Sequence, residues 1–113
     1  MENRRSHARY QAAVVAEVQL DGGILEGETR DISEGGVSLI LEQALEEDSQ
    51  VALQLILTQD GIEDPGEEPF EADARVIWSA PTDDDRSMTG VRFVGVDAQQ
   101  DARLRRFLAA LAE

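Results

Sequence analysis

Two short segments of the chain hold the residues whose types and spacing suit chemistry. The first is Arg5-Ser6-His7-Ala8-Arg9, in which three residues separate two arginines. The second is Asp31-Ile32-Ser33-Glu34-Gly35-Gly36, which has the spacing Asp-x-Ser-x-x-Gly. A guanidinium is always charged and can bind phosphate or a purine edge through two parallel hydrogen bonds. These residue types therefore favour binding of a polar anion.

Each segment alone also has a simpler interpretation. Arginines near a chain terminus are most often part of a solvated tail. Asp31 and Ser33 can form an Asx-type or Ser-type turn, and Gly35 and Gly36 can serve only as turn residues. The two segments support a functional hypothesis only if the fold brings them together.

The charge of the chain is distributed unevenly, and this narrows the class of ligand. The chain has ten arginines, no lysines and 24 acidic residues, which gives a formal net charge of −14. Residues 1–9 carry a local net charge of +2, whereas the rest of the chain holds 7 arginines and 23 acidic residues. Such a field repels nucleic acid polymers and anionic membranes. An approaching anion is repelled nearly everywhere except at the N-terminal arm.

The composition argues against several other classes of protein. The absence of cysteine excludes disulfides, thiol catalysis and cysteine-ligated metals. The single histidine, His7, leaves no histidine cluster, and the acidic residues lack metal-ligand spacing, so no metal and no catalytic residue are expected. Apolar stretches are too short to span a bilayer, and no secretory signal follows Met1. We therefore expect a cytoplasmic protein that is not an enzyme and does not insert into membranes.

Hydrophobic periodicity predicts six strands. They are expected at residues 13–20, 24–32, 37–41, 50–58, 70–79 and 88–94. One side of the second strand is expected to carry Leu25, Gly27, Thr29 and Asp31. One face of the fifth strand is expected to carry Ala72, Ala74, Val76 and Trp78, so this pattern predicts that Trp78 lies in the core.

Residues 97–112 change to a helical period. Asp97 can serve as the N-cap, and an apolar stripe follows at Leu104, Phe107, Leu108 and Leu111. Arginines 103, 105 and 106 lie largely off this stripe, and their simplest interpretation is a solvated face. The elements together predict a mainly all-β fold, a small antiparallel barrel with an appended C-terminal helix.

The first two predicted strands should bring the two chemical segments to one end of this barrel. Asp21-Gly22-Gly23 is a strong tight-turn sequence, so the flanking strands are expected to form a hairpin. The residues between Arg9 and Asp31 have about the length of one hairpin, which returns the chain to where it began. The arm and the Asp-x-Ser-x-x-Gly segment can therefore lie side by side.

The two segments, in this order and at this spacing, resemble those of the PilZ domain family, bacterial receptors for the second messenger cyclic di-GMP. The sequences Ala74-Arg75-Val76-Ile77-Trp78 and Gly90-Val91-Arg92-Phe93 resemble the later strands of the family, so the resemblance covers nearly the whole chain. It implies a six-stranded antiparallel β-barrel with a C-terminal α-helix and a flexible N-terminal arm. The expected organisation is a single domain over residues 1–113, with the arm at 1–11, the barrel at 12–94 and the helix at 97–112.

The resemblance also implies that the ligand is cyclic di-GMP and that no cofactor is needed. Arg5 and Arg9 are then the candidates for guanine stacking, guanine-edge contacts and phosphate neutralisation. Arg4 precedes the first motif arginine and can stack on a second, intercalated ligand molecule. The sequence leaves open whether one or two ligand molecules bind at the site.

The second segment has complementary roles under the same resemblance. Asp31 can accept hydrogen bonds from the N1–H and amino group of guanine, and Ser33 can donate its hydroxyl to the ligand. Gly36 fits a turn in which a Cβ would obstruct the ligand or the required backbone conformation, and Gly35 can share that role.

Two hypotheses for the function follow. In the first, cyclic di-GMP orders the arm, which creates or hides a surface for an unidentified partner protein in motility, pilus or exopolysaccharide control. In the second, the same fold is a protein–protein interaction adaptor whose acidic surface meets a basic partner without nucleotide. A monomer or a ligand-dependent dimer is expected, and the sequence does not name the partner.

Overall fold

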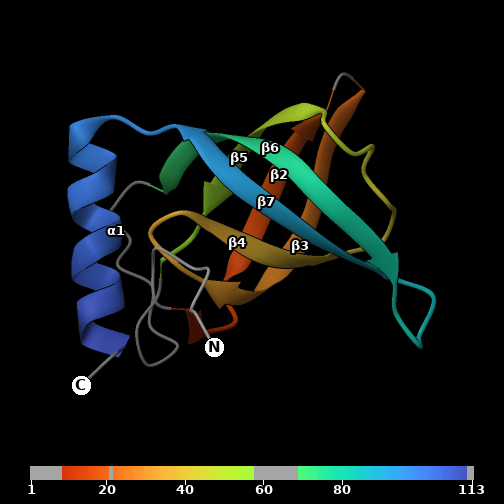
Figure 1. Cartoon of the computed structure of the whole chain (residues 1–113), viewed down its shortest axis with the longest axis horizontal. Coiled ribbons are helices and arrows are strands. Elements are labelled where there is room, and N and C mark those ends of the chain that lie inside the picture. Colours follow the sequence, from red (N-terminus) through yellow and green to blue (C-terminus); the bar gives the residue numbers. More distant parts are fainter. Residues whose placement is uncertain (1–8, 21, 58–68, 112–113) are drawn as a thin grey trace, which may run out of the picture.

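The computed structural model describes residues 9–20, 22–57 and 69–111, and these form strands and one helix (Figure 1). The strands are β1 (Tyr10–Gln11), β2 (Val15–Leu20), β3 (Gly23–Ile32), β4 (Gly36–Leu41), β5 (Gln50–Leu55), β6 (Phe70–Pro81) and β7 (Ser87–Gly95). The helix α1 (Ala98–Leu111) follows β7. Arg4, Arg5 and His7 lie outside the described residues.

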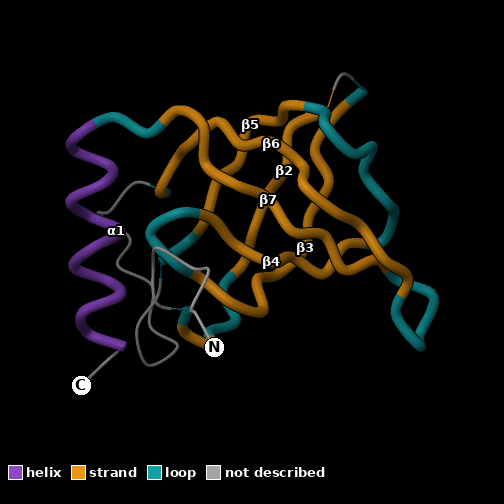
Figure 2. The backbone as a smooth tube through the Cα atoms, in the orientation of Figure 1, coloured by secondary structure: helices purple, strands orange, loops and turns teal. Residues whose placement is uncertain are grey.

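Six of the strands close into an antiparallel barrel, as the backbone tube in Figure 2 shows. The order is β3-β2-β5-β6-β7-β4, and β4 pairs back with β3 to complete the ring. The predicted fold class is therefore confirmed. One difference is the short extra strand β1, which pairs with the end of β3, with Tyr10 opposite Ile32 and Gln11 opposite Asp31. The last residues of the predicted arm are thus part of the sheet.

Alternating side chains build the core inside the barrel. In β5, and in β6 from Phe70 to Val76, every second residue is buried, as expected for strands with one solvated face. The tilted rings of Phe70 and Phe93 pack with their centroids 5.4 Å apart. Thr29 is a buried polar residue whose hydroxyl donates to the Ala12 carbonyl oxygen at 2.6 Å and accepts from the Val14 amide at 2.9 Å. These bonds fix the segment between β1 and β2.

A β-bulge in β3 reverses the alternation just before the Asp-x-Ser-x-x-Gly segment. Thr29 faces Leu39 of β4, but the next pair joins Asp31 to Ser38, so Arg30 is the extra residue. Thr29 points into the barrel, whereas the Asp31 side chain points outward and is 28% exposed. The prediction that Thr29 and Asp31 share one side is wrong, because a bulge shifts the alternation by one residue.

A second bulge has the same effect in β6. Val76 faces Val91 of β7, and the next pair joins Trp78 to Gly90, which leaves Ile77 as the extra residue. Val76 is fully buried, whereas Trp78 is 39% exposed. The prediction that Trp78 is a core residue is therefore wrong, and the cause is again a one-residue shift in the alternation.

The helix α1 stands beside the barrel and packs its apolar stripe against it (Figure 1). The Asp97 carboxylate accepts a hydrogen bond from the Gln100 amide at 2.8 Å, which confirms the predicted N-cap. The buried residues of the helix are Leu104, Phe107 and Leu108. No helix in the described part of the chain is long and apolar enough to cross a membrane.

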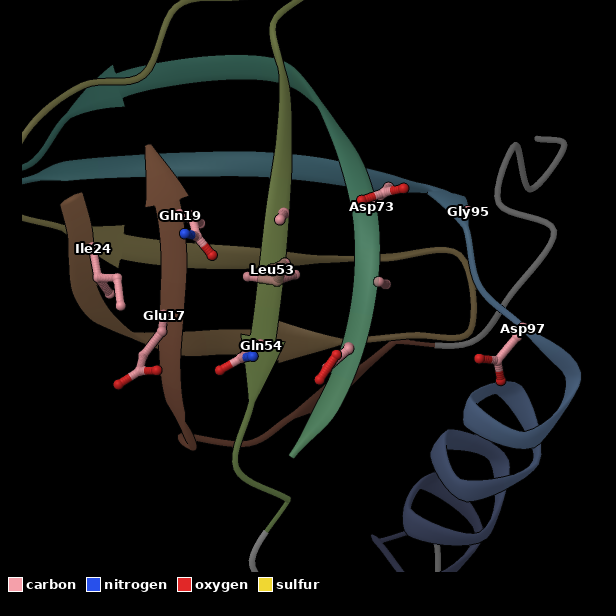
Figure 3. A pocket seen from close by; sticks show the side chains of 11 residues that line it. Glu17, Gln19, Ile24, Leu53, Gln54, Asp73, Gly95 and Asp97 are labelled. Carbon is pink, nitrogen blue, oxygen red and sulfur yellow. The ribbon is translucent and has the colours of Figure 1, made fainter. Parts of the chain in front are cut away.

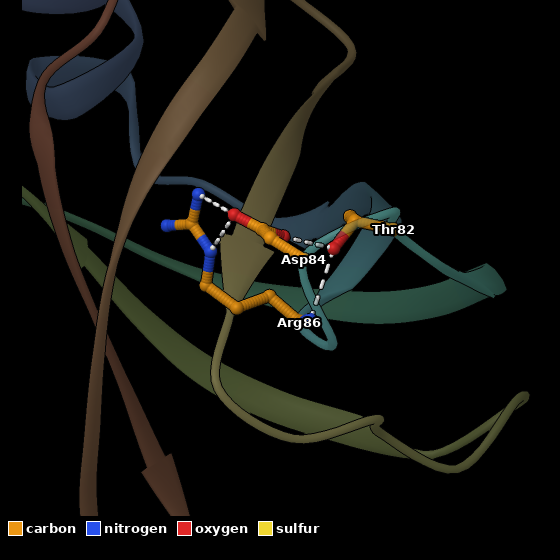
Figure 4. Close-up of polar contacts among 3 residues, drawn as sticks. All are labelled: Thr82, Asp84 and Arg86. Atoms are coloured by element: carbon orange, nitrogen blue, oxygen red, sulfur yellow. Dashed lines mark hydrogen bonds and ion pairs between the residues drawn. The ribbon is translucent and has the colours of Figure 1, made fainter.

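The turn between β6 and β7 is held by three polar side chains (Figure 4). Arg86 donates from Nε and Nη2 to Oδ2 of Asp84, at 3.0 and 2.7 Å. Thr82 accepts from the Arg86 amide at 2.9 Å and donates to Oδ1 of Asp84 at 2.5 Å. The hydrogen bonds from Arg86 and then Thr82 lower the pKa of Asp84 from 3.8 to about 2.

Candidate functional site

The fold brings the second arginine of the arm to the Asp-x-Ser-x-x-Gly segment. Pairing of β1 with β3 places Arg9, the residue before β1, next to the end of β3. Nη1 of Arg9 lies 3.9 Å from Oδ2 of Asp31, and both side chains are partly exposed, at 41% and 28%. The structure thus joins two of the predicted site residues on the outer face of the barrel. Exposed ion pairs of this kind contribute about 0–1 kcal/mol, so both groups remain available to a ligand.

Ser33 closes the turn between β3 and β4 with its own hydroxyl. Its Oγ accepts hydrogen bonds from the amides of Gly35 and Gly36, at 3.2 and 3.1 Å, and lies 3.1 Å from the Gly36 carbonyl oxygen, to which it donates. A hydroxyl has one proton and two acceptor sites, so these bonds use its full capacity. The residue is 8% exposed. Of the two roles considered for Ser33, this geometry favours positioning the turn over direct donation to a ligand.

Gly36 is needed for contact between strands. A Cβ at this position would collide with the carbonyl oxygen of Val91 in β7, and it would also lie 3.1 Å from Cα of Arg92. The only glycine with positive φ among the described residues is Gly23. Among the described contacts, the close approach of β7 explains the need for a small residue at Gly36, and a positive φ does not. The adjacent Gly35 carbonyl accepts from the Phe93 amide at 2.9 Å, which ties the turn to β7.

The two bulges align an acidic and an aromatic side chain on one outward-facing row. The register places Asp31 of β3 opposite Ser38 of β4, Ser38 opposite Gly90 of β7, and Gly90 opposite Trp78 of β6. A Cβ on Gly90 would overlap Nε1, Cε2 and Cδ1 of Trp78, so the indole lies over the glycine. With neighbouring strands about 4.8 Å apart, the row spans about 14 Å.

Trp78 is thus a candidate site residue that sequence reasoning missed. Alternation assigned it to the core, and only the pairing of Trp78 with a glycine across the sheet would have indicated otherwise. The indole is amphipathic, with a flat apolar face and an N–H donor. It can therefore stack on a planar group of a ligand that extends across the row from Asp31.

A family model for the PilZ domain matches residues 3–110 of the chain. The chain belongs to the PilZ domain family. Comparison with curated protein sequences gives no match.

Solved structures show the same fold. The inhibitor of motility MotI/DgrA of Bacillus subtilis is 15% identical, with a TM-score of 0.79 over 98% of this chain and 52% of that chain. The PilZ domain of Escherichia coli YcgR, solved with c-di-GMP, is 22% identical, with a TM-score of 0.73 over 97% and 92%. The PilZ domain of CeSA from a cellulose-synthesizing bacterium is 22% identical, with a TM-score of 0.60 over 94% and 99%. This chain spans about half the length of the MotI/DgrA chain.

The turn of this PilZ domain is also linked to the C-terminal helix. Nε of Arg105 lies 3.1 Å from Oε1 of Glu34, within the turn, and 3.0 Å from Oδ2 of Asp101, one helical turn earlier. Tyr10 of β1 lines a shallow pocket together with Glu34 and Arg105. The predicted solvated face of the helix is therefore partly correct, since Arg105 is exposed but reaches the candidate site.

A hollow on another face of the PilZ barrel is unsuited to an anion (Figure 3). It has a volume of about 290 Å³ and lies over β2, β5 and β6, where the small Ala52 separates Gln19 from Asp73. The carboxylates that line it belong to Glu17, Glu71, Asp73 and Asp97, and the described lining residues include no arginine. The described lining of this hollow therefore offers only negative charge to an approaching anion.

The described residues contain no group of three or more acidic, histidine or cysteine side chains that could hold a metal ion. The side chains gathered at the candidate site instead offer a guanidinium, a carboxylate and an indole. These groups bind planar and charged ligands through hydrogen bonds and stacking.

Proposed function

We propose that this PilZ domain is a receptor for cyclic di-GMP, which binds where the N-terminal arm meets the turn after β3. The observation that carries the proposal is the approach of Arg9 to Asp31 on the outer face of the barrel, at 3.9 Å. Support also comes from the structural likeness to E. coli YcgR and K. pneumonia MrkH, each solved in complex with c-di-GMP.

The proposed contacts follow from the chemistry of the two partners. The Asp31 carboxylate accepts hydrogen bonds from N1–H and the amino group on the guanine edge. Arg9 leaves its weak pairing with Asp31 to bind a phosphate or the guanine, at a cost of about 0–1 kcal/mol. Arg4 and Arg5 are proposed to add guanidinium groups from the arm, where stacking on guanine and phosphate binding are both open to them.

Ser33, Gly35 and Gly36 are proposed to act through the shape of the turn. The Ser33 hydroxyl fixes the two glycine amides, and Gly36 allows β7 to approach. Together they hold the backbone that follows Asp31 in one conformation. This is a positioning role, distinct from contact with the nucleotide.

Trp78 is proposed to bind the second base. The ligand carries two guanines. The backbone positions of Asp31 and Trp78 are about 14 Å apart across the sheet, and the indole shortens this gap because it lies over Gly90. One guanine can then pair with Asp31 while the other stacks on the exposed indole, a contact worth about 1–3 kcal/mol per base.

The output is proposed to be contact with a partner protein, in motility, pilus or exopolysaccharide control. The Arg105–Glu34 pair offers a route from the turn to α1, because a ligand that reorders the turn also moves the carboxylate that Arg105 binds. The competing adaptor hypothesis assigns the acidic hollow to a basic partner and requires no nucleotide.

The decisive experiment is isothermal titration with cyclic di-GMP, together with emission from Trp78, the single tryptophan of the chain. Arg5→Ala and Asp31→Ala should lose binding, and Arg106→Ala, on the exposed side of α1, is the control that matches the charge change of Arg5→Ala. Saturable heat and a change in emission, both lost in the two site variants, would support the receptor hypothesis and give the stoichiometry. The absence of heat at high ligand concentration, from a folded sample, would refute it in favour of the adaptor.

A further inference from the structure

Two arginines occupy directly paired positions on neighbouring strands of the barrel, next to the turn. The register pairs Arg75 of β6 directly with Arg92 of β7, and Arg92 with Gly36 of β4. Ala74 and Val91, their respective neighbours in sequence, are buried, so both guanidinium groups lie on the outer face. Side chains directly opposite on paired strands have Cβ atoms about 4.5–5.5 Å apart.

The positive charges of this pair lack carboxylate partners among the described residues. Nη1 of Arg75 donates to the backbone carbonyl of Asp48 at 3.1 Å, which leaves its charge uncompensated. The Arg92 side chain is exposed, and it makes no hydrogen bond or ion pair within the described part of the chain. In contrast, Arg86 and Arg105 are each ion-paired with carboxylates. Like charges at directly paired positions of a sheet are unfavourable, and neither guanidinium has a carboxylate partner among the described residues, so the pair favours binding of an anion.

The pair lies at the edge of the candidate site. Gly36 has no side chain, so nothing from β4 at this position covers Arg92. Gly36 lies two residues before Ser38, which pairs with Asp31. Strand spacings of about 4.8 Å and a rise of about 3.3 Å per residue put Cα of Arg92 about 12 Å from Cα of Asp31. A ligand with two bases and two phosphates can therefore contact both places.

We propose that Arg75 and Arg92 form a phosphate subsite of the nucleotide site, on the side of the turn opposite to Arg9. This inference rests on the proposed function and extends it to two residues outside the two sequence motifs. Each guanidinium can donate two parallel hydrogen bonds to a phosphate. A phosphate bound by both arginines would link β6 to β7, so binding should stabilise this strand pairing.

The test uses Arg75→Ala and Arg92→Ala with cyclic di-GMP, and Arg106→Ala as the control for loss of one exposed positive charge. Removing a charge-assisted hydrogen bond should weaken binding about tenfold or more in each site variant. Binding by the site variants should also depend less steeply on salt, because fewer ionic contacts form. Arg106→Ala should bind as the wild type does.

A second probe separates this inference from the proposed function. Inorganic pyrophosphate is titrated at low salt while the Nε–Hε resonances of Arg75 and Arg92 are followed by NMR. Shifts of both resonances, with the Arg75 shift lost in Arg92→Ala, support the subsite even if cyclic di-GMP does not bind. If cyclic di-GMP binds the wild type and both variants equally, the subsite is refuted while the receptor hypothesis stands. If neither probe binds, both proposals are refuted.

Discussion

Ser33→Ala tests whether this residue acts on the turn or on the ligand. The substitution removes three hydrogen bonds of Oγ within the turn, at 3.1–3.2 Å, and retains the bond from the Ser33 amide to the Gly36 carbonyl. Long, partly buried bonds lie near the lower end of the usual net contribution, about 0.5–1 kcal/mol each. We therefore expect a loss of about 1.5–3 kcal/mol in the free energy of unfolding.

The measurement is urea unfolding followed by far-ultraviolet circular dichroism, with thermal unfolding as a second probe. A loss of this size should lower the melting temperature by about 6–13 °C in a domain of this length, without changing the denaturant slope. Ser38→Ala is the matched control, because Ser38 is also a buried serine but lies outside the turn. It should cost less than Ser33→Ala.

Binding by Ser33→Ala completes the argument. If Ser33 only positions the turn, cyclic di-GMP should still bind, more weakly, and ligand should restore part of the lost stability through mass action. A variant that unfolds like the wild type and yet loses binding would refute the positioning role, and direct contact with the ligand would replace it.

Three further predictions concern other contacts. Gly90→Ala should shift the emission maximum of Trp78, because the added Cβ overlaps the indole, and unchanged emission would contradict the placement of the ring. Gly36→Ala should lower the free energy of unfolding by about 1–3 kcal/mol, because β7 backbone blocks the methyl group; a wild-type urea midpoint would argue against this contact. Arg86→Ala should raise the pKa of Asp84 from about 2 towards 3.8 in an NMR titration. Because folding lowers the pKa of Asp84, its pairing with Arg86 stabilises the fold above about pH 3.8, and this effect is lost as the pH falls towards 2. An unchanged titration midpoint of Asp84 in Arg86→Ala would contradict the hydrogen bonds between the two side chains.

The fold could be predicted because its main determinants are local patterns. Alternation located the six barrel strands, and the helical stripe with Asp97 as its cap located α1. The hairpin argument also correctly placed Arg9 near Asp31, because antiparallel pairing returns the chain to its starting point.

The face of the sheet to which an individual side chain points was harder to predict from the sequence. Strict alternation has a period of two residues, and no residue type in the sequence indicates where a bulge adds an extra residue. Asp31 and Trp78 were therefore assigned to the wrong faces, each by one position. For Ser33 the residue type allowed two roles, and only the distances to the glycine amides distinguish them. The ligand-binding roles of the site residues stay predictions.

The bulge at Arg30 has a consequence for related domains in which the same strand is regular. Without the bulge, Arg30 would pair with Ser38, and strict alternation after the inward-pointing Thr29 would turn the Asp31 carboxylate into the barrel. Deleting Arg30 would instead keep Asp31 opposite Ser38 and facing solvent. Two domains with identical motifs can therefore differ in whether a nucleotide can reach the carboxylate, and the pairing of the preceding strand decides between them.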